Sequence, residues 1–156
     1  MIEIERKFLV SSNRYRKLAS RKFILVQGYL NSDPERTVRV RLKNQTGYIA
    51  IKGKSCEDGL SRFEWEKEIS KHEAETLLEL CEKTVIRKTR FEISVADHLF
   101  EVDEFTGPNN GLIIAEVELS HKNEKFLKPD WLGREVTGEK KYYNSNLSKH
   151  PFTNWD

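Results

Sequence analysis

The chain has 156 residues, of which 37% are hydrophobic and 33% charged, and its 27 Lys and Arg against 25 Asp and Glu leave a formal net charge of +2. This length predicts one domain with its own core over residues 1–156. The near balance of charge argues against nonspecific binding to nucleic acid or to a membrane surface, because such binding needs a clear basic excess.

The cysteines and the apolar runs indicate a compartment. Cys56 and Cys81 have neither metal-ligand spacing nor the pattern of a disulfide framework, which is typical of the reducing cytoplasm. Acidic residues follow Met1 at once, where a signal peptide would have an apolar stretch, and no apolar run approaches the length of a membrane span. We therefore expect a cytoplasmic protein with no membrane partner.

Short segments of alternating polar and apolar residues predict strands along most of the chain. They lie at 2–10, 23–31, 36–43, 47–54, 61–69, 84–95, 98–105 and 112–120. Residues typical of turns separate several of them, as in "NSDPE" and "NQTG". Segments joined by such short turns pair as antiparallel neighbours, because a parallel partner needs a longer crossover.

One helix has clear boundaries. Ser70 and Glu73 have the spacing of a capping box, and apolar residues at helical spacing follow as far as Cys81, which predicts a helix over 70–82. Shorter helices are expected at 12–19, 122–128 and 144–149. The chain is thus predicted to be an α+β domain dominated by an antiparallel sheet.

Most of the predicted strands carry one apolar face and one charged face. Residues two apart on a strand share a face, and the charged faces group Glu3, Glu5 and Lys7; Arg39 and Arg41; Lys52; Glu64, Glu66 and Glu68; Lys88 and Arg90; and Glu116 and Glu118. The ordinary interpretation is a sheet with one buried and one solvated face, in which cross-strand ion pairs contribute little.

A closed barrel is the alternative interpretation. About eight antiparallel strands are enough to close a barrel, which would turn the charged faces inward. Carboxylates suit hard cations such as Mg²⁺ or Mn²⁺, whereas Arg and Lys suit phosphate oxygens. Blocks of like charge on separate strands favour a metal bound beside a polyanion, which is the arrangement that phosphoryl transfer needs.

Tyr29 and Lys88 are candidates for a catalytic role. A lone tyrosine on a strand most often packs in a core; alternatively, Tyr29 pairs with Lys88 to orient an attacking water. A lysine crowded by Arg39, Arg41 and Arg90 can lose its proton near neutral pH and act as a general base.

The motifs resemble a known family. "EIERK" at 3–7 is similar to the ExExK signature of the CYTH domain, whose members are also called triphosphate tunnel metalloenzymes. The resemblance continues in the family's order through "TVRVRL" (37–42), "IKG" (51–53), "RFEWE" (62–66), "RKTRF" (87–91), "VDEFTGPNNGLIIAEVEL" (102–119) and "EVTGEKKYYNSNL" (135–147).

The resemblance implies an eight-stranded, closed antiparallel β-barrel with a charged lumen and a few flanking helices. The short chain resembles the compact bacterial branch, which implies metal-dependent hydrolysis of inorganic tripolyphosphate. Alternatives are a thiamine or nucleoside triphosphatase, a class IV-like adenylate cyclase that converts ATP to cyclic AMP, and a polyphosphate or nucleotide sensor without activity. A sensor would lose the metal-binding acids, whereas Glu3, Glu5 and Glu118 are present here.

The resemblance also implies roles for individual residues. Mg²⁺ or Mn²⁺ would be held by Glu3, Glu5 and Glu118, with Glu116 and Asp103 nearby. The triphosphate substrate would be bound by Lys7, Arg39, Arg41, Lys52, Lys88, Arg90 and Lys140, and Glu64 and Glu66 would line the lumen. Whether Lys140 or Lys141, and whether Asp103 or Glu104, points inward is left open. A homodimer would cover apolar patches left on the outside of the barrel.

Overall fold

The computed structural model describes residues 2–82 and 84–156, and most of them form one antiparallel sheet. Its strands are β1 (Ile2–Val10), β2 (Arg21–Asn31), β3 (Arg36–Lys43), β4 (Thr46–Gly53), β5 (Ser61–Ile69), β6 (Ile86–Val95), β7 (His98–Phe105), β8 (Ile113–Glu118) and β9 (Leu132–Glu135). All eight predicted strands are confirmed, with small shifts at their ends. The four residues of β9 lack a long alternating pattern and were not predicted.

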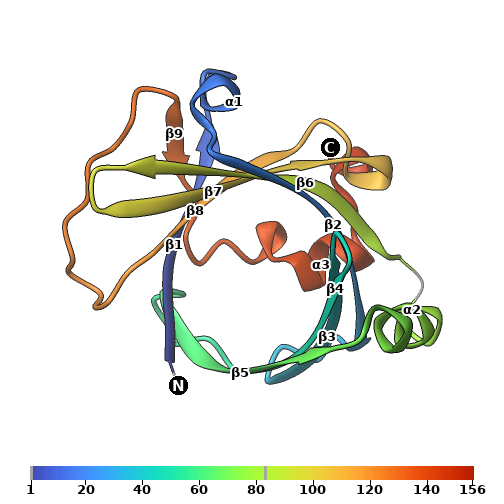
Figure 1. Cartoon of the computed structure of the whole chain (residues 1–156). Coiled ribbons are helices and arrows are strands. Elements are labelled where there is room, and N and C mark those ends of the chain that lie inside the picture. Colours follow the sequence, from blue (N-terminus) through green and yellow to red (C-terminus); the bar gives the residue numbers. More distant parts are fainter. Residues whose placement is uncertain (1, 83) are drawn as a thin grey trace.

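The sheet closes on itself. Its order is β5-β4-β3-β2-β6-β7-β8-β1, and β5 also pairs with β1, so these eight strands form a ring around a central lumen (Figure 1). The closing pairs are Ile2 with Phe63, Glu3 with Arg62, and Ile4 with Ser61. The strand β9 pairs with the end of β1 beyond the ring. The predicted closed barrel is therefore confirmed.

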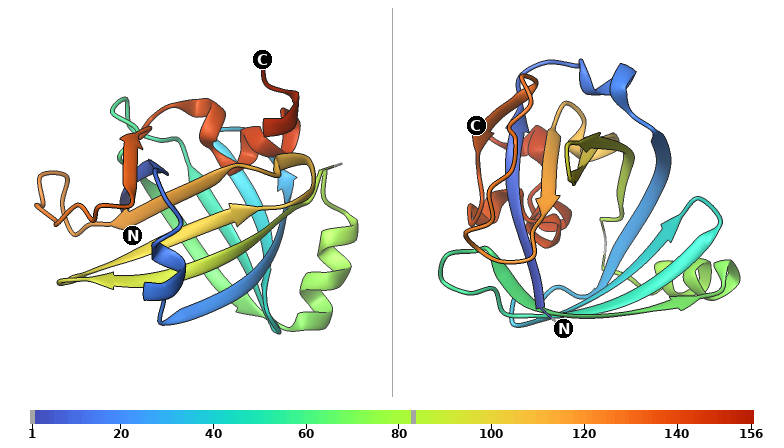
Figure 2. Two further views of the ribbon diagram at one scale, coloured as in Figure 1. Left: turned by 90° about the horizontal axis from the view of Figure 1, so that it is seen from above. Right: turned by 60° about the vertical axis from the view of Figure 1, so that its left-hand side comes forward.

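The helix α2 (Lys71–Glu79) begins with the predicted capping box. Ser70 Oγ accepts a hydrogen bond from the Glu73 N–H at 3.0 Å, and Glu73 Oε1 accepts one from the Ser70 N–H at 2.9 Å. The helix lies along the outside of β3 and β4 (Figure 2). A Cβ at Gly47 of β4 would lie 2.7 Å from the Cβ of Ala74, so this glycine lets the helix approach the sheet closely.

The shorter helices agree with the predictions in part. The helices α1 (Tyr15–Leu18) and α3 (Asn144–Lys149) fall within the predicted ranges, and three short 3₁₀ helices, η1 (Gly107–Asn109), η2 (Lys140–Tyr142) and η3 (Phe152–Asn154), were not predicted. The helix expected at 122–128 is wrong, because this segment is irregular after a turn. Proline at 129 disfavours helical geometry in the residue before it, and the Phe126 ring packs against Phe8 and Phe100 instead.

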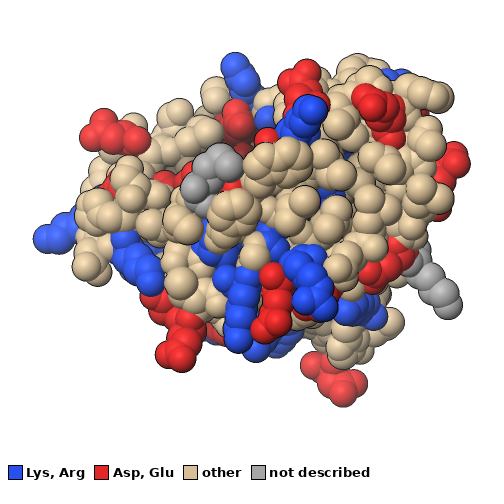
Figure 3. Space-filling model, turned by 90° about the horizontal axis from the view of Figure 1, so that it is seen from below, with Lys and Arg blue, Asp and Glu red and all other residues tan. Residues whose placement is uncertain are grey.

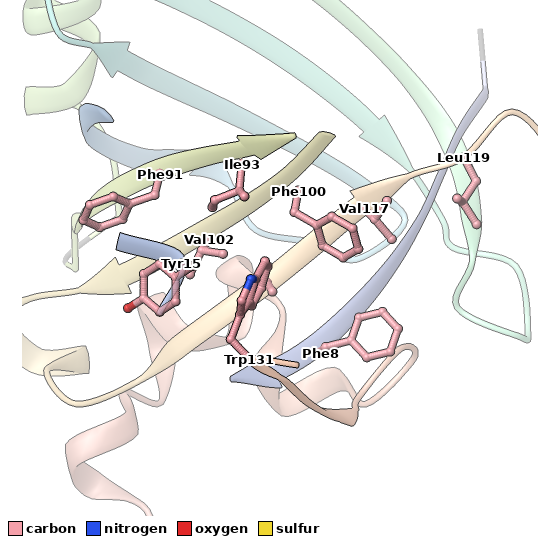
Figure 4. Packing of buried hydrophobic residues seen from close by; sticks show 10 residues of the cluster. Phe8, Tyr15, Phe91, Ile93, Phe100, Val102, Val117, Leu119 and Trp131 are labelled. Carbon is pink, nitrogen blue, oxygen red and sulfur yellow. The ribbon is translucent and has the colours of Figure 1, made fainter. Parts of the chain in front are cut away.

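The outer cluster is a hydrophobic core on the outside of β1, β6, β7 and β8 (Figure 4). Its buried members are Phe8, Tyr15, Phe91, Ile93, Phe100, Val102, Ala115, Val117, Leu119 and Trp131. The Trp131 ring lies edge-on to the rings of Tyr15 and Phe100, with centroids 5.8 and 5.5 Å away. The predicted apolar strand faces thus point outward here, where α1 and the chain leading to β9 cover them.

The inner cluster is a second core inside the barrel. Ile86, Phe105 and Ile114 lie two residues from charged lumen positions on their strands, so they face the lumen too. They pack against the C-terminal residues Val136, Tyr142 and Leu147, and Figure 1 shows α3 within the ring. The prediction of a barrel with a few helices is confirmed, and α3 differs from α1 and α2 in that its apolar face packs against this apolar end of the lumen.

The outer surface mixes both signs of charge. Figure 3 shows Lys and Arg side chains next to Asp and Glu side chains over one face of the molecule. Among the described residues, no helix combines the length and the apolar character that crossing a membrane requires.

Candidate active site

A cavity of about 220 Å³ occupies the part of the lumen that the inner cluster leaves free. Among the described residues, its wall contains seven basic and seven acidic side chains. The structure brings these predicted residues to the wall: Glu3, Glu5, Lys7, Tyr29, Arg39, Arg41, Lys52, Glu64, Glu66, Lys88, Arg90, Glu116 and Glu118. The equal numbers make the formal charge of the wall zero, so a polyanion bound alone would add net negative charge that a bound cation would balance.

Strand register sets which charges become neighbours. Lys7 of β1 lies opposite Glu116 of β8, and its Nζ is 3.6 Å from the carboxylate. Lys52 of β4 lies opposite Glu64 of β5 and is 3.0 Å from it. The same Nζ is 3.1 Å from Glu3. The ring therefore interleaves acids and bases from different strands, although each strand carries mostly one sign.

Arg39 and Arg41 share a single carboxylate. Their terminal nitrogens donate to the same Oε2 of Glu66 at 3.1 and 3.3 Å. Both Nε–H groups are buried, and neither has a hydrogen-bond partner among the described residues. Burial, together with Arg39 and Arg90, lowers the pKa of Arg41 to about 10, so it stays charged at neutral pH. One carboxylate cannot neutralise two guanidinium groups, which leaves donors for an anion.

Asp103 holds two cations. Its two oxygens accept hydrogen bonds from Arg90 at 2.7 and 2.9 Å, and one of them lies 2.7 Å from Lys88 Nζ. It is 2% exposed and is not on the cavity wall. Glu104 turns outward and binds Arg16, so the alternative left open resolves to Asp103. The geometry makes Asp103 a charge partner for the bases instead of a free metal ligand.

Lys88 combines burial with unequal neighbours. Burial lowers its pKa to about 8; Asp103 opposes this change and Arg90 adds to it. Its Nζ also donates to Asn144 Oδ1 at 3.2 Å. A lysine that exchanges its proton near neutral pH is chemically able to act as a general base.

Tyr29 lines the same cavity, but it does not contact Lys88. The strand register places Lys88 opposite Leu25, four positions before Tyr29 on β2, and no hydrogen bond joins the two side chains among the described residues. Burial raises the pKa of Tyr29, and Arg39, Arg62 and Lys7 oppose that rise. Within the described residues, Tyr29 and Lys88 therefore form no direct pair. The two side chains could act together only across the cavity.

The pKa shifts of the carboxyl groups on the cavity wall indicate whether a divalent metal would be stable there. Burial raises the pKa of Glu5 well above its usual value, and Glu116 and Glu3 raise it further. Burial also raises the pKa of Glu118, together with Glu3. Burial opposes the ionisation of Glu116, but Lys7 and a hydrogen bond with Glu5 outweigh it, so its pKa is lowered. Glu5 and Glu116 therefore do not ionise together easily, and a divalent cation bound beside them would offset the repulsion between their two negative charges.

Carboxylate oxygens are therefore suitable ligands for a hard metal ion, but their present positions do not form a complete coordination site. Within residues 2–82 and 84–156, no three Asp, Glu, His or Cys side chains converge as metal ligands. Glu3 is held by Lys52, and Glu116 by Lys7. A metal would have to compete with these lysines for the carboxylates. A bound phosphate group would weaken this competition, because its oxygens offer the lysines other hydrogen-bond acceptors.

Lys140 does not reach the cavity. It is exposed in η2 and is absent from the cavity wall, and the ammonium of Lys141 lies over the rings of Tyr142 and Trp155. The alternative between Lys140 and Lys141 therefore resolves to neither. The C-terminal segment supplies Tyr143, Asn144 and Ser145 instead.

Several lining residues were missed by the sequence reasoning. Arg62 and Glu101 share strand faces with predicted residues, so alternation could have identified them. Thr137, Gly138 and Tyr143 come from irregular chain, and Asn144 and Ser145 come from the first turn of α3, so none of them has such a signal. Gly59 has a φ of +73°, and a Cβ on it would lie 2.4 Å from the Cα of Gly138, so glycine lets these two loops meet beside the cavity.

Known proteins resemble this chain over almost its whole length. The model of the CYTH domain matches residues 1–151. An inorganic triphosphatase of Acetivibrio thermocellus is 50% identical over 154 residues, which cover 98% of this chain and 97% of the relative. One of Nitrosomonas europaea is 38% identical over 151 residues, which cover 95% and 97%. A crystal structure of an inorganic triphosphatase has a TM-score of 0.66 and 32% identity, covering 94% of this chain and 97% of that one.

Proposed function

The chain belongs to the CYTH domain family, and on that premise we propose that it hydrolyses inorganic tripolyphosphate to pyrophosphate and phosphate with the help of a divalent metal. Two relatives that match nearly its whole length are named inorganic triphosphatases. The observation that carries the proposal is the cavity wall, which holds both guanidinium donors without a described partner and a group of carboxylates that repel one another.

The triphosphate is bound by the basic side chains of the wall. They are Lys7, Arg39, Arg41, Lys52, Lys88 and Arg90, to which the structure adds Arg62. The Nε–H groups of Arg39 and Arg41 are buried and have no hydrogen-bond partner among the described residues, so these guanidinium groups have donor capacity that the lumen does not satisfy. The guanidinium fork suits phosphate oxygens, so these two arginines orient the substrate as well as attract it.

The metal, Mg²⁺ or Mn²⁺, would be held by Glu3, Glu5 and Glu118, with Glu116 beside them. When bound, it supplies positive charge to the phosphate oxygens and to the leaving group. Glu64 and Glu66 keep Lys52, Arg39 and Arg41 in the lumen until substrate arrives.

The reaction is the attack of water on a terminal phosphorus. A new bond forms from the water oxygen to that phosphorus, the bond to the bridging oxygen breaks, and pyrophosphate leaves with the electron pair. The neutral amine of Lys88 takes the proton that the water loses, while Arg39 and Arg41 stabilise charge on the transferred group. Tyr29, on the same wall, helps to orient the water.

The test is phosphate release from tripolyphosphate, thiamine triphosphate, ATP and pyrophosphate, each with Mg²⁺ or Mn²⁺. We expect release from tripolyphosphate to be fastest. Glu5→Gln should reduce it by about 100-fold or more, since loss of even an outer partner of a metal site costs about 10–100-fold. Glu75→Gln, on the exposed side of α2, is the matched control and should keep the wild-type rate.

Three results would contradict the proposal or a part of it. No release from any triphosphate would exclude hydrolysis, and conversion of ATP to cyclic AMP in the same samples would replace it with cyclase activity. Equal rates for Glu5→Gln and Glu75→Gln would remove the carboxylates of β1 from the metal site.

The homodimer and the cytoplasmic location stay predictions. Exposed apolar side chains on the outer faces of β4 and β5 support the dimer: Ile51 lies opposite Trp65, and Phe63 lies on the same face as Trp65. A second copy of this chain could cover them.

A further inference from the structure

Gln27 is a polar side chain buried inside the barrel without a function assigned so far. It lies on β2 between Leu25 and Tyr29, so it faces the lumen as Tyr29 does. Its exposed fraction is 0%, and neither its amide nitrogen nor its amide oxygen has a described partner with hydrogen-bonding geometry, although the amide lies close enough to Tyr29 to lower the pKa of that phenol. Gln27 stands behind the cavity wall, since it is not among the residues that line the cavity.

An amide in this state destabilises the fold. Leaving a buried donor or acceptor unsatisfied costs about 1–3 kcal/mol, and most buried polar side chains in proteins have partners. A methionine or leucine would fill the same space without that cost. Because sites that break a packing rule are often functional sites, the neighbours of Gln27 become informative.

Arg41, a neighbour of Gln27 on β3, has a buried donor that also lacks a partner among the described residues. The register of β2 and β3 places Gln27 directly opposite Arg41, and facing Cβ atoms in such a pair lie about 4.5–5.5 Å apart. The Nε–H of Arg41 is buried without a partner, as is Oε1 of Gln27. The terminal nitrogen of Arg41 is drawn instead to Glu66 at 3.3 Å. An unused donor and an unused acceptor therefore face each other.

The other neighbours offer the amide of Gln27 few hydrogen-bond partners besides Arg41. Across β6 it faces Ile86, which is apolar and buried. Along β2 it lies beside Tyr29. Burial is the largest influence on the pKa of that phenol and raises it, whereas the hydrogen-bonding influence of the Gln27 amide lowers it; no contact with proper hydrogen-bond geometry joins these two described side chains. The amide thus lies between the phosphate-binding Arg41 and the candidate residue Tyr29.

We propose that Gln27 is a positioning residue for the triphosphate. When phosphate oxygens replace Glu66 as partners of Arg41, the side chain of Arg41 shifts and its Nε–H donates to Oε1 of Gln27. This bond fixes the plane of the guanidinium, so that its terminal nitrogens point at the phosphate. The inference rests on the proposed substrate, and Gln27 acts through Arg41 without touching the substrate.

The test measures affinity and stability in the same variants. Gln27→Met keeps the length of the side chain and removes its hydrogen bonding. We expect the Kd for tripolyphosphate, measured by calorimetry in EDTA so that no hydrolysis occurs, to rise about tenfold or more, because a hydrogen bond to a charged group is lost. With metal added, KM should rise more than kcat falls. The melting temperature should stay equal or increase, since an unpaired amide has left the core.

A double-mutant cycle distinguishes positioning from packing. Arg41→Lys keeps the charge but lacks the guanidinium Nε–H, so adding Gln27→Met to it should change Kd less than about twofold. Leu25→Met is the matched control on the same face of β2, and it should leave Kd unchanged. Gln27→Leu carries the same expectation where the methionine variant does not fold.

Three results would overturn the inference: an unchanged Kd in Gln27→Met, a full tenfold loss on top of Arg41→Lys, or a melting temperature several degrees lower. If the wild type binds tripolyphosphate but does not hydrolyse it with metal, the proposed reaction fails while the role of Gln27 in binding stands. If the wild type binds tripolyphosphate neither in EDTA nor with metal, both fail.

Discussion

Lys88 shows at the scale of one residue how this barrel lowers the pKa of the side chain that we propose as the base. Its ammonium is held by Asp103 and Asn144, yet burial outweighs the attraction of Asp103 and the pKa falls to about 8. Arg90 binds both oxygens of Asp103, so the carboxylate that would keep Lys88 charged is already shared. The charge state of Lys88 therefore depends on how two cations divide one acid.

We predict that activity follows the deprotonation of Lys88. The ordinary pKa of lysine is near 10.5, and burial lowers it to about 8 here, so the neutral amine becomes available as the pH rises through about 8. The value of kcat/KM for tripolyphosphate should increase up to that pH and level off above it. A pH series of initial rates at fixed free metal measures this.

Lys88→Arg is the control for this pH profile. The arginine stays charged at every pH in the series, so kcat should fall by about 10²–10⁴-fold, the usual contribution of a general base, and the step near pH 8 should disappear. An unchanged step in this variant would assign it to the substrate or to another group.

At the scale of one element, α2 illustrates a part of the molecule whose stability is separate from activity. Its capping box gives hydrogen-bond acceptors to two backbone N–H groups at the start of the helix, those of Ser70 and Glu73. The helix packs on the outer faces of β3 and β4. None of its residues lines the cavity among those described. Changes at its first turn should therefore alter folding without altering chemistry.

We predict that Ser70→Ala destabilises the protein by about 1 kcal/mol, because the N–H of Glu73 loses its acceptor. In a chain of this length that corresponds to a melting temperature lower by about 2–4 °C. Thermal unfolding measures it, and Ser70→Asn, which also caps helices well, should retain most of the stability. A loss of kcat in Ser70→Ala at a temperature where it is folded would contradict the separation.

At the scale of the whole molecule, the two hydrophobic cores stabilise different parts of the barrel. The outer cluster packs the outside of β1, β6, β7 and β8 under α1 and the chain before β9, and the inner cluster anchors the C-terminal segment inside the barrel. Because that segment also supplies Tyr143, Asn144 and Ser145 to the cavity, the inner core is coupled to the site and the outer core is not.

We predict that equal damage to the two cores has unequal effects on activity. Leu147→Ala and Ile93→Ala each remove a fully buried side chain and should each cost about 2–5 kcal/mol. Leu147→Ala should also lower kcat about 10- to 100-fold, because it loosens the segment that places Asn144 against Lys88. Urea unfolding and initial rates on the same samples measure both quantities. Equal kcat in the two variants would contradict the coupling.

The sequence by itself determined the strands and the chemistry of their faces. Side-chain direction in a strand alternates locally, so "EIERK" and "RFEWE" already place Glu3, Glu5, Glu64 and Glu66 on one face each, and the capping box already marks α2. These features depend on neighbours two to four residues away, which is why the pattern is sufficient. The resemblance to a family added the closed barrel, which alternation alone left open against a solvated sheet.

Only the tertiary structure decided which charges meet and which remain unpaired. Asp103 is held by Lys88 and Arg90, Lys140 stays outside, and Gln27 faces Arg41, because these relations follow from the register between strands and from the path of the C-terminal segment. The entry of α3 into the lumen could not be predicted either, since its apolar residues would fit the outside of a sheet equally well. Contacts between residues distant in sequence arise from closure of the ring, and no local pattern encodes that closure.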